Sequence, residues 1–147
     1  MADRILRRAT LKDEPDVVWC IDRAYATYAR AIPDLPQVSQ GIDRDITDNI
    51  VWVAELDGKI AGVLVLVPGS DSLTIANVAV DPANKGQGLG RALMETAAAE
   101  AIRLGTPSLR LSTHVNMPEN VALYAYLGWA EVGREGNKVH MSKEVHA

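Results

Sequence analysis

Cysteine is almost absent from this chain: Cys20 is the only one among 147 residues. A single thiol cannot form an internal disulfide, and the spaced Cys and His pairs of a zinc site are also missing. These absences argue against a disulfide-stapled secreted domain and against a Cys/His zinc site. We therefore expect a reduced, cytoplasmic protein that holds no metal.

Long hydrophobic runs are missing as well. The longest apolar run, Ile60 to Val67, is far shorter than the roughly 20 residues that a membrane-spanning helix needs. The first ten residues, MADRILRRAT, lack the apolar stretch of a signal peptide. The sequence predicts neither membrane insertion nor export.

An excess of basic residues is the third absence. The formal net charge is -4, and acidic and basic residues are mixed along the chain without a basic stripe that would neutralise phosphates. Nucleic acid is therefore not an expected partner. Repeats, low-complexity tracts and long linkers are not found, and 147 residues with 48% hydrophobic side chains suit one domain over residues 1–147.

Periodicity and turn residues predict the elements of the first half of the chain. A strand at Arg4 to Arg8 precedes a helix with Thr10 as its N-cap that ends near Arg30, and a short helix is predicted over Gln40 to Asn49. The long helix buries a stripe at helical spacing that consists of Val17, Cys20, Ile21, Ala24 and Tyr28.

Two apolar runs, Ile50 to Leu56 and Lys59 to Val67, flank the dipeptide Asp57-Gly58. Such a dipeptide tolerates positive φ and is typical of a two-residue hairpin turn. The second run hardly alternates between apolar and polar residues, which predicts a strand covered on both faces by helices.

The second half alternates strands and helices. The predicted elements are a strand at Leu73 to Val80, a helix at Leu89 to Leu104, a strand at Leu109 to Thr113, a helix from about Pro118 to Tyr126, and a strand pair at Trp129 to Arg134 and Lys138 to Lys143. This order is typical of a mixed α/β sheet with helices on both faces.

A glycine-rich stretch joins the strand ending at Val80 to the helix beginning at Leu89. Gly86, Gly88 and Gly90 remove Cβ atoms from a loop whose N–H groups can converge on an anion at the positive end of the helix dipole. A pyrophosphate would fit there. A glycine-rich turn that only lets the helix pack close to the strand is an equally good interpretation of the spacing alone.

The spacing also tests other nucleotide folds. Counting G-x-G-x-x-G from Gly86 places Arg91 where a Rossmann fingerprint needs its third glycine, and Gly-Lys-Ser/Thr of a P-loop does not occur. Both folds are disfavoured.

The segment VAVDPANKGQGLGR, residues 78–91, resembles the acetyl-CoA-binding motif Arg/Gln-x-x-G-x-G/A of GNAT acetyltransferases, with Lys85 at the Arg/Gln position. Lysine keeps the positive charge there but lacks the planar guanidinium fork. The segment NVALYAYLGW, residues 120–129, resembles the second GNAT landmark, a helix that carries Asn and Tyr and ends at Leu-Gly-aromatic. In many members the Asn lies seven residues before the Tyr, whereas Asn120 lies four before Tyr124.

The resemblance spans nearly the whole chain except residues 31–49. It implies the α/β (α+β) GNAT fold: a mixed, mostly antiparallel sheet of about seven strands flanked by four helices, splayed between the fourth and fifth strands. It also implies acetyl-CoA as cosubstrate, a primary amine of a small molecule or peptide as acceptor, and a possible homodimer. The implied cofactor-binding residues are Val78, Ala79, Val80, Lys85, Gly86, Gln87, Gly88, Leu89, Gly90, Arg91, Asn120 and Tyr124.

In the family the amine attacks the thioester directly, so no enzyme nucleophile is needed. The resemblance assigns Tyr124 to the coenzyme sulfur, where a phenol can protonate the departing thiolate. It assigns the backbone N–H of Val78 or Ala79 to the thioester carbonyl. Without the resemblance, Tyr124 would be interpreted as a core residue of an amphipathic helix.

The general base is not evident. Many relatives carry a Glu on the fourth strand, whereas this chain has Thr74 to Asn77 there, and an amide cannot accept a proton as a carboxylate does. His114 is the best alternative catalytic residue because imidazole titrates near neutrality, although a strand-end histidine is more often a surface residue. Glu119 is interpreted as a helix-start charge.

By analogy, the acceptor pocket lies between the first helices and the sheet, near Tyr25, Tyr28, Trp52 and residues 33–41. Core packing explains Trp52 and Tyr25 equally well. Asp34, Asp43 and Asp45 would attract a cationic amine, but a solvated acidic loop is the simpler interpretation. Two other functions stay open: a non-catalytic acyl-CoA-binding or regulatory module, and a nucleotide-binding protein of another fold.

Overall fold

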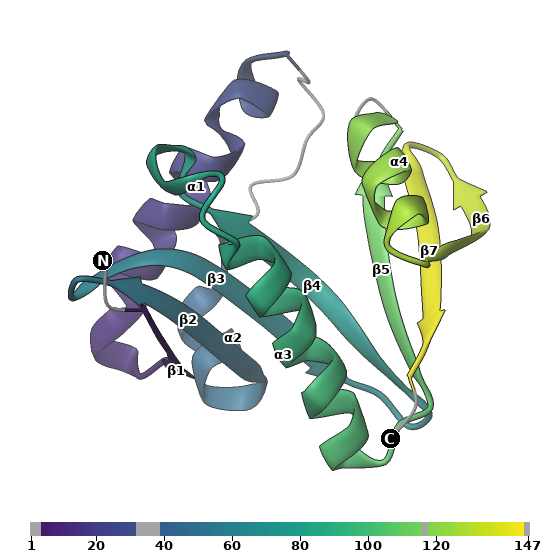
Figure 1. Ribbon diagram of the computed structural model, residues 1–147, viewed down its shortest axis with the longest axis horizontal. Coiled ribbons are helices and arrows are strands. Elements are labelled where there is room, and N and C mark those ends of the chain that lie inside the picture. Colours follow the sequence, from purple (N-terminus) through teal and green to yellow (C-terminus); the bar gives the residue numbers. More distant parts are fainter. Residues whose placement is uncertain (1–3, 32–38, 116–117, 146–147) are drawn as a thin grey trace.

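The computed structural model describes residues 4–31, 39–115 and 118–145, without the side chains of residues 27–31 and 118–119 (Figure 1). The described strands form one seven-stranded sheet in the order β1-β2-β3-β4-β5-β7-β6. The strands are β1 (Arg4–Arg8), β2 (Ile50–Leu56), β3 (Lys59–Pro68), β4 (Ser72–Val80), β5 (Ser108–His114), β6 (Ala130–Glu135) and β7 (Lys138–Glu144). The helices are α1 (Glu14–Ala31), α2 (Ile42–Asp48), α3 (Leu89–Leu104) and α4 (Pro118–Tyr126), with short 3-10 turns η1 (Leu11–Asp13) and η2 (Pro82–Asn84).

The predicted order of elements is confirmed, and all strand pairs are antiparallel except β4 with β5. The first helix differs at its start, because η1 separates Thr10 from α1. Asp13 holds this turn: its carboxylate accepts hydrogen bonds from the Thr10 backbone N–H at 2.8 Å and from Arg7 Nη1 at 2.8 Å.

Helices cover both faces of the sheet. In Figure 1, α3 and α4 lie in front of the strands, whereas α1 and α2 lie behind them. Leu64 and Leu66 of β3 belong to the buried cluster under α3, and Val63 and Val65 belong to the cluster under α1. This double burial explains why the sequence of β3 does not alternate, as predicted.

The predicted hairpin turn between β2 and β3 is also confirmed. Asp57 and Gly58 have φ angles of 52° and 81°, so both central residues adopt the left-handed region that a type I′ turn requires. The right-handed twist of such turns matches the twist of the two strands and fixes their antiparallel pairing.

The predicted splay between the fourth and fifth strands is present. The parallel pairing of β4 with β5 covers only Ser72↔Ser108 through Ile75↔Leu111, although both strands continue beyond it. Figure 1 shows the upper halves of β4 and β5 diverging, with β7, β6 and α4 following β5. Among the strands that the structure describes, none pairs with the end of β4 on that side.

A β-bulge in β4 begins at the same level. Leu66 of β3 pairs with Ile75 and Val65 pairs with Asn77, so the register skips Ala76. Ile75 belongs to the cluster under α3, whereas Ala79 belongs to the cluster under α1. Because a bulge changes which face successive side chains point to, Asn77 is placed on the α1 face.

Among the described residues, no helix combines the length and the apolar character that crossing a bilayer requires.

Candidate active site

The loop between β4 and α3 combines positive φ angles with the start of a helix. Gly86 and Gly88 have φ angles of 83° and 77°, and Gly88 is the N-cap residue of α3. A Cβ atom at Gly86 would have no atom within 4 Å, whereas one at Gly90 would lie 3.8 Å from Val80 Cγ2. Gly86 and Gly88 therefore shape the loop through their positive φ angles, whereas a Cβ atom at Gly90 would make only an ordinary van der Waals contact with β4. Leu89 is 1% exposed, so only its backbone can face a ligand.

Asp81 fixes the beginning of this loop, and the motif comparison did not identify it. Its buried carboxylate accepts hydrogen bonds from the Ala83 N–H at 3.0 Å and from Arg23 Nε of α1 at 3.1 Å. Its own N–H donates to the Ala61 carbonyl of β3 at 2.8 Å. The signal in the sequence was Asp-Pro at the start of a turn, which is typical of an N-cap.

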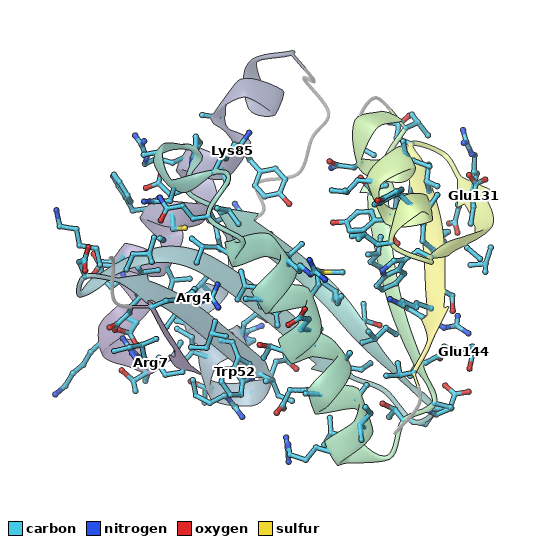
Figure 2. All side chains as sticks on the ribbon, viewed as in Figure 1. Arg4, Arg7, Trp52, Lys85, Glu131 and Glu144 are labelled. Atoms are coloured by element: carbon cyan, nitrogen blue, oxygen red, sulfur yellow. The ribbon has the colours of Figure 1, made fainter. Side chains whose placement is uncertain are left out.

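Two cationic groups lie at the loop. Lys85 is exposed and precedes Gly86. Arg4 reaches from β1 toward the start of α3 (Figure 2), and its Nη1 lies 3.8 Å from where a Gly88 Cβ would be. Among the described residues, the Arg4 guanidinium makes no hydrogen bond or ion pair. A guanidinium at the positive end of a helix is unfavourable without an anion, so Arg4 is a candidate phosphate ligand that sequence reasoning missed.

Two further motif residues, Gln87 and Arg91, lie in the loop and in the first turn of α3. Arg91 is exposed and pairs with Glu95 along α3, with Nε 3.4 Å from Oε1. Gln87 is exposed in the loop, and none of the described contacts of its side chain assigns it a role. Their predicted cofactor contacts stay predictions.

Backbone direction separates the two candidates for the thioester carbonyl. Strand residues alternate the side to which their N–H groups point. Since the Asp81 N–H donates to Ala61 of β3, the N–H of Ala79 also points toward β3, and those of Val78 and Val80 point toward the diverging β5. Val78 is therefore the better candidate of the two predicted donors.

Helix α4 brings the second motif to β5. Asn120 Nδ2 donates to Thr113 Oγ1 at 3.5 Å, and Tyr124 lies one turn later on the same helix face. The helix ends as the Leu-Gly-Trp pattern requires: Gly128 has a φ of 97°, and the Trp129 N–H donates to the Tyr124 carbonyl at 2.9 Å. The Tyr124 and Trp129 rings meet edge to face, with centroids 5.9 Å apart.

Burial raises the pKa of Tyr124 above its ordinary value. The phenol is therefore protonated at neutral pH and is a hydrogen-bond donor, which suits the predicted role at a departing thiolate.

His114 lies at the end of β5 and is 9% exposed. Strand alternation places Thr113 on the face of α4 and His114 on the opposite face, which is the face of α1. The structure thus separates the two predicted catalytic side chains: Tyr124 lies with α4, and His114 faces the other way.

The residues predicted near the acceptor pocket lie in different parts of the structure. The Tyr25 hydroxyl donates to Asn77 Oδ1 at 3.3 Å, which brings together two residues that the sequence analysis considered separately. Of the two interpretations of Trp52, core packing is the one that the structure supports: Trp52 packs against the cluster under α3, on the face of β2 opposite α1. Asp45 accepts a hydrogen bond from Asn49 Nδ2 at 2.9 Å, and Asp43 is exposed on α2.

Some of the residues named in the sequence analysis lie outside the described part of the chain. They are residues 32–38, which include Asp34, and the side chains of Tyr28 and Glu119.

In the part of the chain that the structure describes, no group of three or more His, Cys, Asp or Glu side chains is arranged to hold a metal ion.

Comparison with known families decides the assignment. The model of the GNAT acetyltransferase domain family matches residues 47–131, which include β2 to β5, the glycine loop, α3 and α4. The chain belongs to the GNAT family of N-acetyltransferases. Members of this family use acetyl-CoA and act on amine acceptors.

Individual relatives agree with this assignment. The N-acetyltransferase YjgM of Escherichia coli is 27% identical over 140 residues, covering 87% of this chain and 83% of that protein. The ribosomal protein bS18-alanine N-acetyltransferase of E. coli is 37% identical over 75 residues, and the match spans only 51% of each chain. Mycothiol acetyltransferase of Rhodococcus jostii is 33% identical over 119 residues, 80% of this chain but 37% of that longer protein.

Solved structures share the fold. The PaiA N-acetyltransferase of Thermoplasma acidophilum, determined with coenzyme A, has a TM-score of 0.83 at 15% identity and covers 97% of this chain and 99% of that one. The S18-alanine N-acetyltransferase of E. coli has a TM-score of 0.80 at 22% identity, covering 99% and 96%. Because the relatives are named acetyltransferases, the comparisons favour a catalytic function over a non-catalytic module.

Proposed function

We propose that this protein transfers the acetyl group of acetyl-CoA to a primary amine, and that the amine attacks the thioester directly. The observation that carries the proposal is the glycine loop, which follows the part of β4 that has diverged from β5 and opens α3. Its left-handed Gly86 and Gly88 and the N-terminus of α3 present backbone N–H groups that suit a pyrophosphate. No metal is needed for this chemistry.

The residues of this chain divide the binding of the cosubstrate among them. The first-turn N–H groups of α3, Lys85 and Arg4 bind the phosphates by charge and hydrogen bonding. The unpaired edge of β4 from Val78 to Val80 offers main-chain groups to the amide-containing arm. Tyr124 and Asn120 on α4 contact the cosubstrate from the side opposite β4.

The reaction forms a C–N bond and breaks the C–S bond of the thioester. The Val78 N–H donates to the carbonyl oxygen, where negative charge develops in the tetrahedral intermediate. The Tyr124 hydroxyl gives its proton to the departing thiolate, and the raised pKa of this phenol keeps that proton available at neutral pH. The amine loses a proton when it attacks the thioester, and His114 accepts this proton. The His114 side chain lies on the face of β5 opposite α4.

The test is a measurement of free thiol released from acetyl-CoA in the presence of a panel of primary amines, with the acetylated products identified by mass spectrometry. Amine-dependent release with a stoichiometric acetylated product supports the proposal. Tight acetyl-CoA binding without transfer to any amine would instead support the non-catalytic acyl-CoA-binding module.

The names of two relatives indicate where the panel begins. One acts on the alanine of ribosomal protein bS18, and the other is a mycothiol acetyltransferase. Peptides with a free N-terminus and small-molecule amines are therefore the first acceptors to test. A cytoplasmic location stays a prediction that rests on the single cysteine.

We also propose a homodimer that forms through α4 and the edge strand β6. This surface exposes Leu123, Tyr126 and Val132 by 52%, 87% and 59%, and an edge strand carries backbone groups that a second copy can pair with. Sedimentation of the wild type and of Tyr126→Asp tests it: a dimer that dissociates in the variant supports the proposal, and a wild-type monomer contradicts it.

A further inference from the structure

The carboxylate of Asp81 is buried between α1 and the start of the glycine loop. Asp81 is 5% exposed, and its Oδ1 accepts hydrogen bonds from the Ala83 N–H at 3.0 Å and from Arg23 Nε at 3.1 Å. Its backbone N–H donates to the Ala61 carbonyl, and its carbonyl accepts the Asn84 N–H, each at 2.8 Å. Asp81 therefore ties the turn η2 to β3 on one side and to α1 on the other.

The turn η2 leads directly into the residues that are proposed to bind the phosphates. Lys85 follows this turn, and its N–H donates to the Pro82 carbonyl at 3.4 Å. Gly86 and Gly88 come next with positive φ angles, and Gly88 is the N-cap residue of α3. The path of the whole loop therefore begins at the hydrogen bonds of Asp81.

A carboxylate at the start of this loop is electrostatically unfavourable for an anion site. Like charges repel, and burial reduces the screening by solvent that would weaken this repulsion. A buried carboxylate without a counter-ion is also costly in the free protein. The charge of Asp81 therefore has to be neutralised if the loop is to hold a pyrophosphate.

Arg23 of α1 supplies the opposite charge, and the fold holds its guanidinium in place. The guanidinium pairs with Asp81 and also stacks over the Trp19 ring, with Cζ 4.7 Å from the ring centroid. Trp19 lies one turn earlier on α1 and is 54% exposed. Stacking of a cation on an aromatic face is favourable, so this exposed tryptophan helps to keep Arg23 over Asp81.

Resting on the proposed acetyl transfer, we propose that Arg23 is a positioning residue for the coenzyme: it neutralises Asp81, so that this carboxylate holds the glycine loop without repelling the phosphates. The proposal gives α1 a part in coenzyme binding, although α1 and α3 lie on opposite faces of the sheet (Figure 1). Lys85 and Arg4 attract the phosphates directly, whereas Arg23 acts through Asp81. The effect of Arg23 is therefore expected to depend on the charge of Asp81.

The experiment measures the Kd of acetyl-CoA by calorimetry at low ionic strength. Arg23→Gln removes the counter-ion. Since the same oxygen of Asp81 accepts both hydrogen bonds, Asp81→Asn can keep them and lose only the charge, and the double variant Arg23→Gln/Asp81→Asn carries neither charge. Asp81→Ala removes the acceptor as well.

Arg103→Gln is the matched control. Arg103 pairs at 2.8 Å with Glu100, whose side chain is 9% exposed against 8% for Asp81, and this pair lies near the other end of α3. The control therefore removes an equivalent ion pair far along the helix from the loop. Circular dichroism establishes that each variant is folded.

Arg23→Gln is expected to weaken acetyl-CoA binding about tenfold, because the buried charge of Asp81 is left without its partner. Asp81→Asn alone should strengthen binding about twofold to threefold, and added to Arg23→Gln it should recover most of the lost affinity. Asp81→Ala should weaken binding about fivefold, since the Ala83 N–H loses its acceptor. A purely structural ion pair would not give this recovery, because the double variant also lacks the pair.

Four outcomes would overturn the inference. They are binding by folded Arg23→Gln as tight as that of the wild type, a double variant as weak as Arg23→Gln, an equal loss in Arg103→Gln, and weaker binding by Asp81→Asn than by the wild type. The last of these tests the inference even if Arg23→Gln does not fold. Failure of the wild type to bind acetyl-CoA would instead contradict the proposed function itself.

Discussion

The two sides of β4 near its divergence from β5 are built in different ways. The side that we propose to bind the coenzyme consists of neighbouring residues, from Val78 through the glycine loop into α3, and it offers mainly backbone N–H groups. The side that faces α1 depends on side chains that lie far apart in the sequence, Tyr25 and Asn77, and on one bulge that turns Asn77 toward α1. One side can therefore be recognised from a short motif, and the other can be recognised only in the folded chain.

The two sides of β4 are therefore expected to be damaged by different kinds of mutation. A backbone-built site is damaged by changes that add a side chain or a charge, whereas a side-chain site is damaged by removing an atom.

Tyr124→Phe is expected to lower kcat about 100-fold, because the phenylalanine cannot protonate the departing thiolate. Acetyl-CoA affinity should be nearly unchanged, since the ring and its edge-to-face contact with Trp129 remain. Steady-state kinetics and calorimetry measure the two quantities. Tyr126→Phe is the matched control, because Tyr126 lies on the same helix and is 87% exposed; an unchanged kcat in Tyr124→Phe would remove this residue from the mechanism.

Arg4→Ala is expected to weaken coenzyme A binding about tenfold, the value of one charge-assisted phosphate contact. Arg8→Ala is the control: Arg8 lies on the same strand and the same face, about 13 Å farther along β1. The difference in Kd between the variants should shrink as salt is added. Equal affinities of both variants and the wild type would show that Arg4 does not contact the phosphates.

Asp13→Asn is expected to lower the free energy of unfolding by about 1 kcal/mol. The ion pair contributes no more than this because Arg7 is partly exposed and solvent screens its charge. Hydrogen bonds from Arg7 lower the pKa of Asp13 to about 2 from its ordinary 3.8. This contribution is present above pH 4 and is lost as the pH falls toward 2. Denaturant unfolding at pH 7 and at pH 2.5 should therefore give a larger difference between wild type and variant at pH 7, while acetyl-CoA affinity stays the same.

Cys20 is expected to show almost no reaction with a thiol reagent at pH 8 in the native protein. Its side chain is fully buried, and burial raises its pKa to about 12 from an ordinary 9.0. Labelling should become complete only in denaturant. Fast labelling of the native chain would show that α1 separates readily from the sheet.

The sequence predicted the elements well because each carries a local signal. Asp57-Gly58 marks a hairpin, and Gly105 marks the end of α3, where it adopts a φ of 72°. The splay was predicted only through the family resemblance, since nothing local in Ile75 or Leu111 indicates where two strands stop pairing.

The glycine loop was predicted more fully than the α1 side of β4 for the same reason. Arg4 was missed because it is 84 positions from Gly88, and two interpretations of Trp52 stayed open because a single apolar strand residue does not reveal which face of a two-sided sheet it occupies. The contact between Tyr25 and Asn77 depends on the bulge at Ala76, and a bulge in an apolar strand leaves no mark in the residue pattern.

The central claim is that the glycine loop binds acetyl-CoA, and Gly88→Glu tests it most directly by calorimetry. The new carboxylate would lie next to Arg4 and repel the phosphates. Gly105→Glu is the control, because its φ of 72° imposes the same backbone strain at the other end of α3. The account predicts that the wild type and Gly105→Glu bind acetyl-CoA and that Gly88→Glu does not; binding by a folded Gly88→Glu equal to that of the wild type would contradict it.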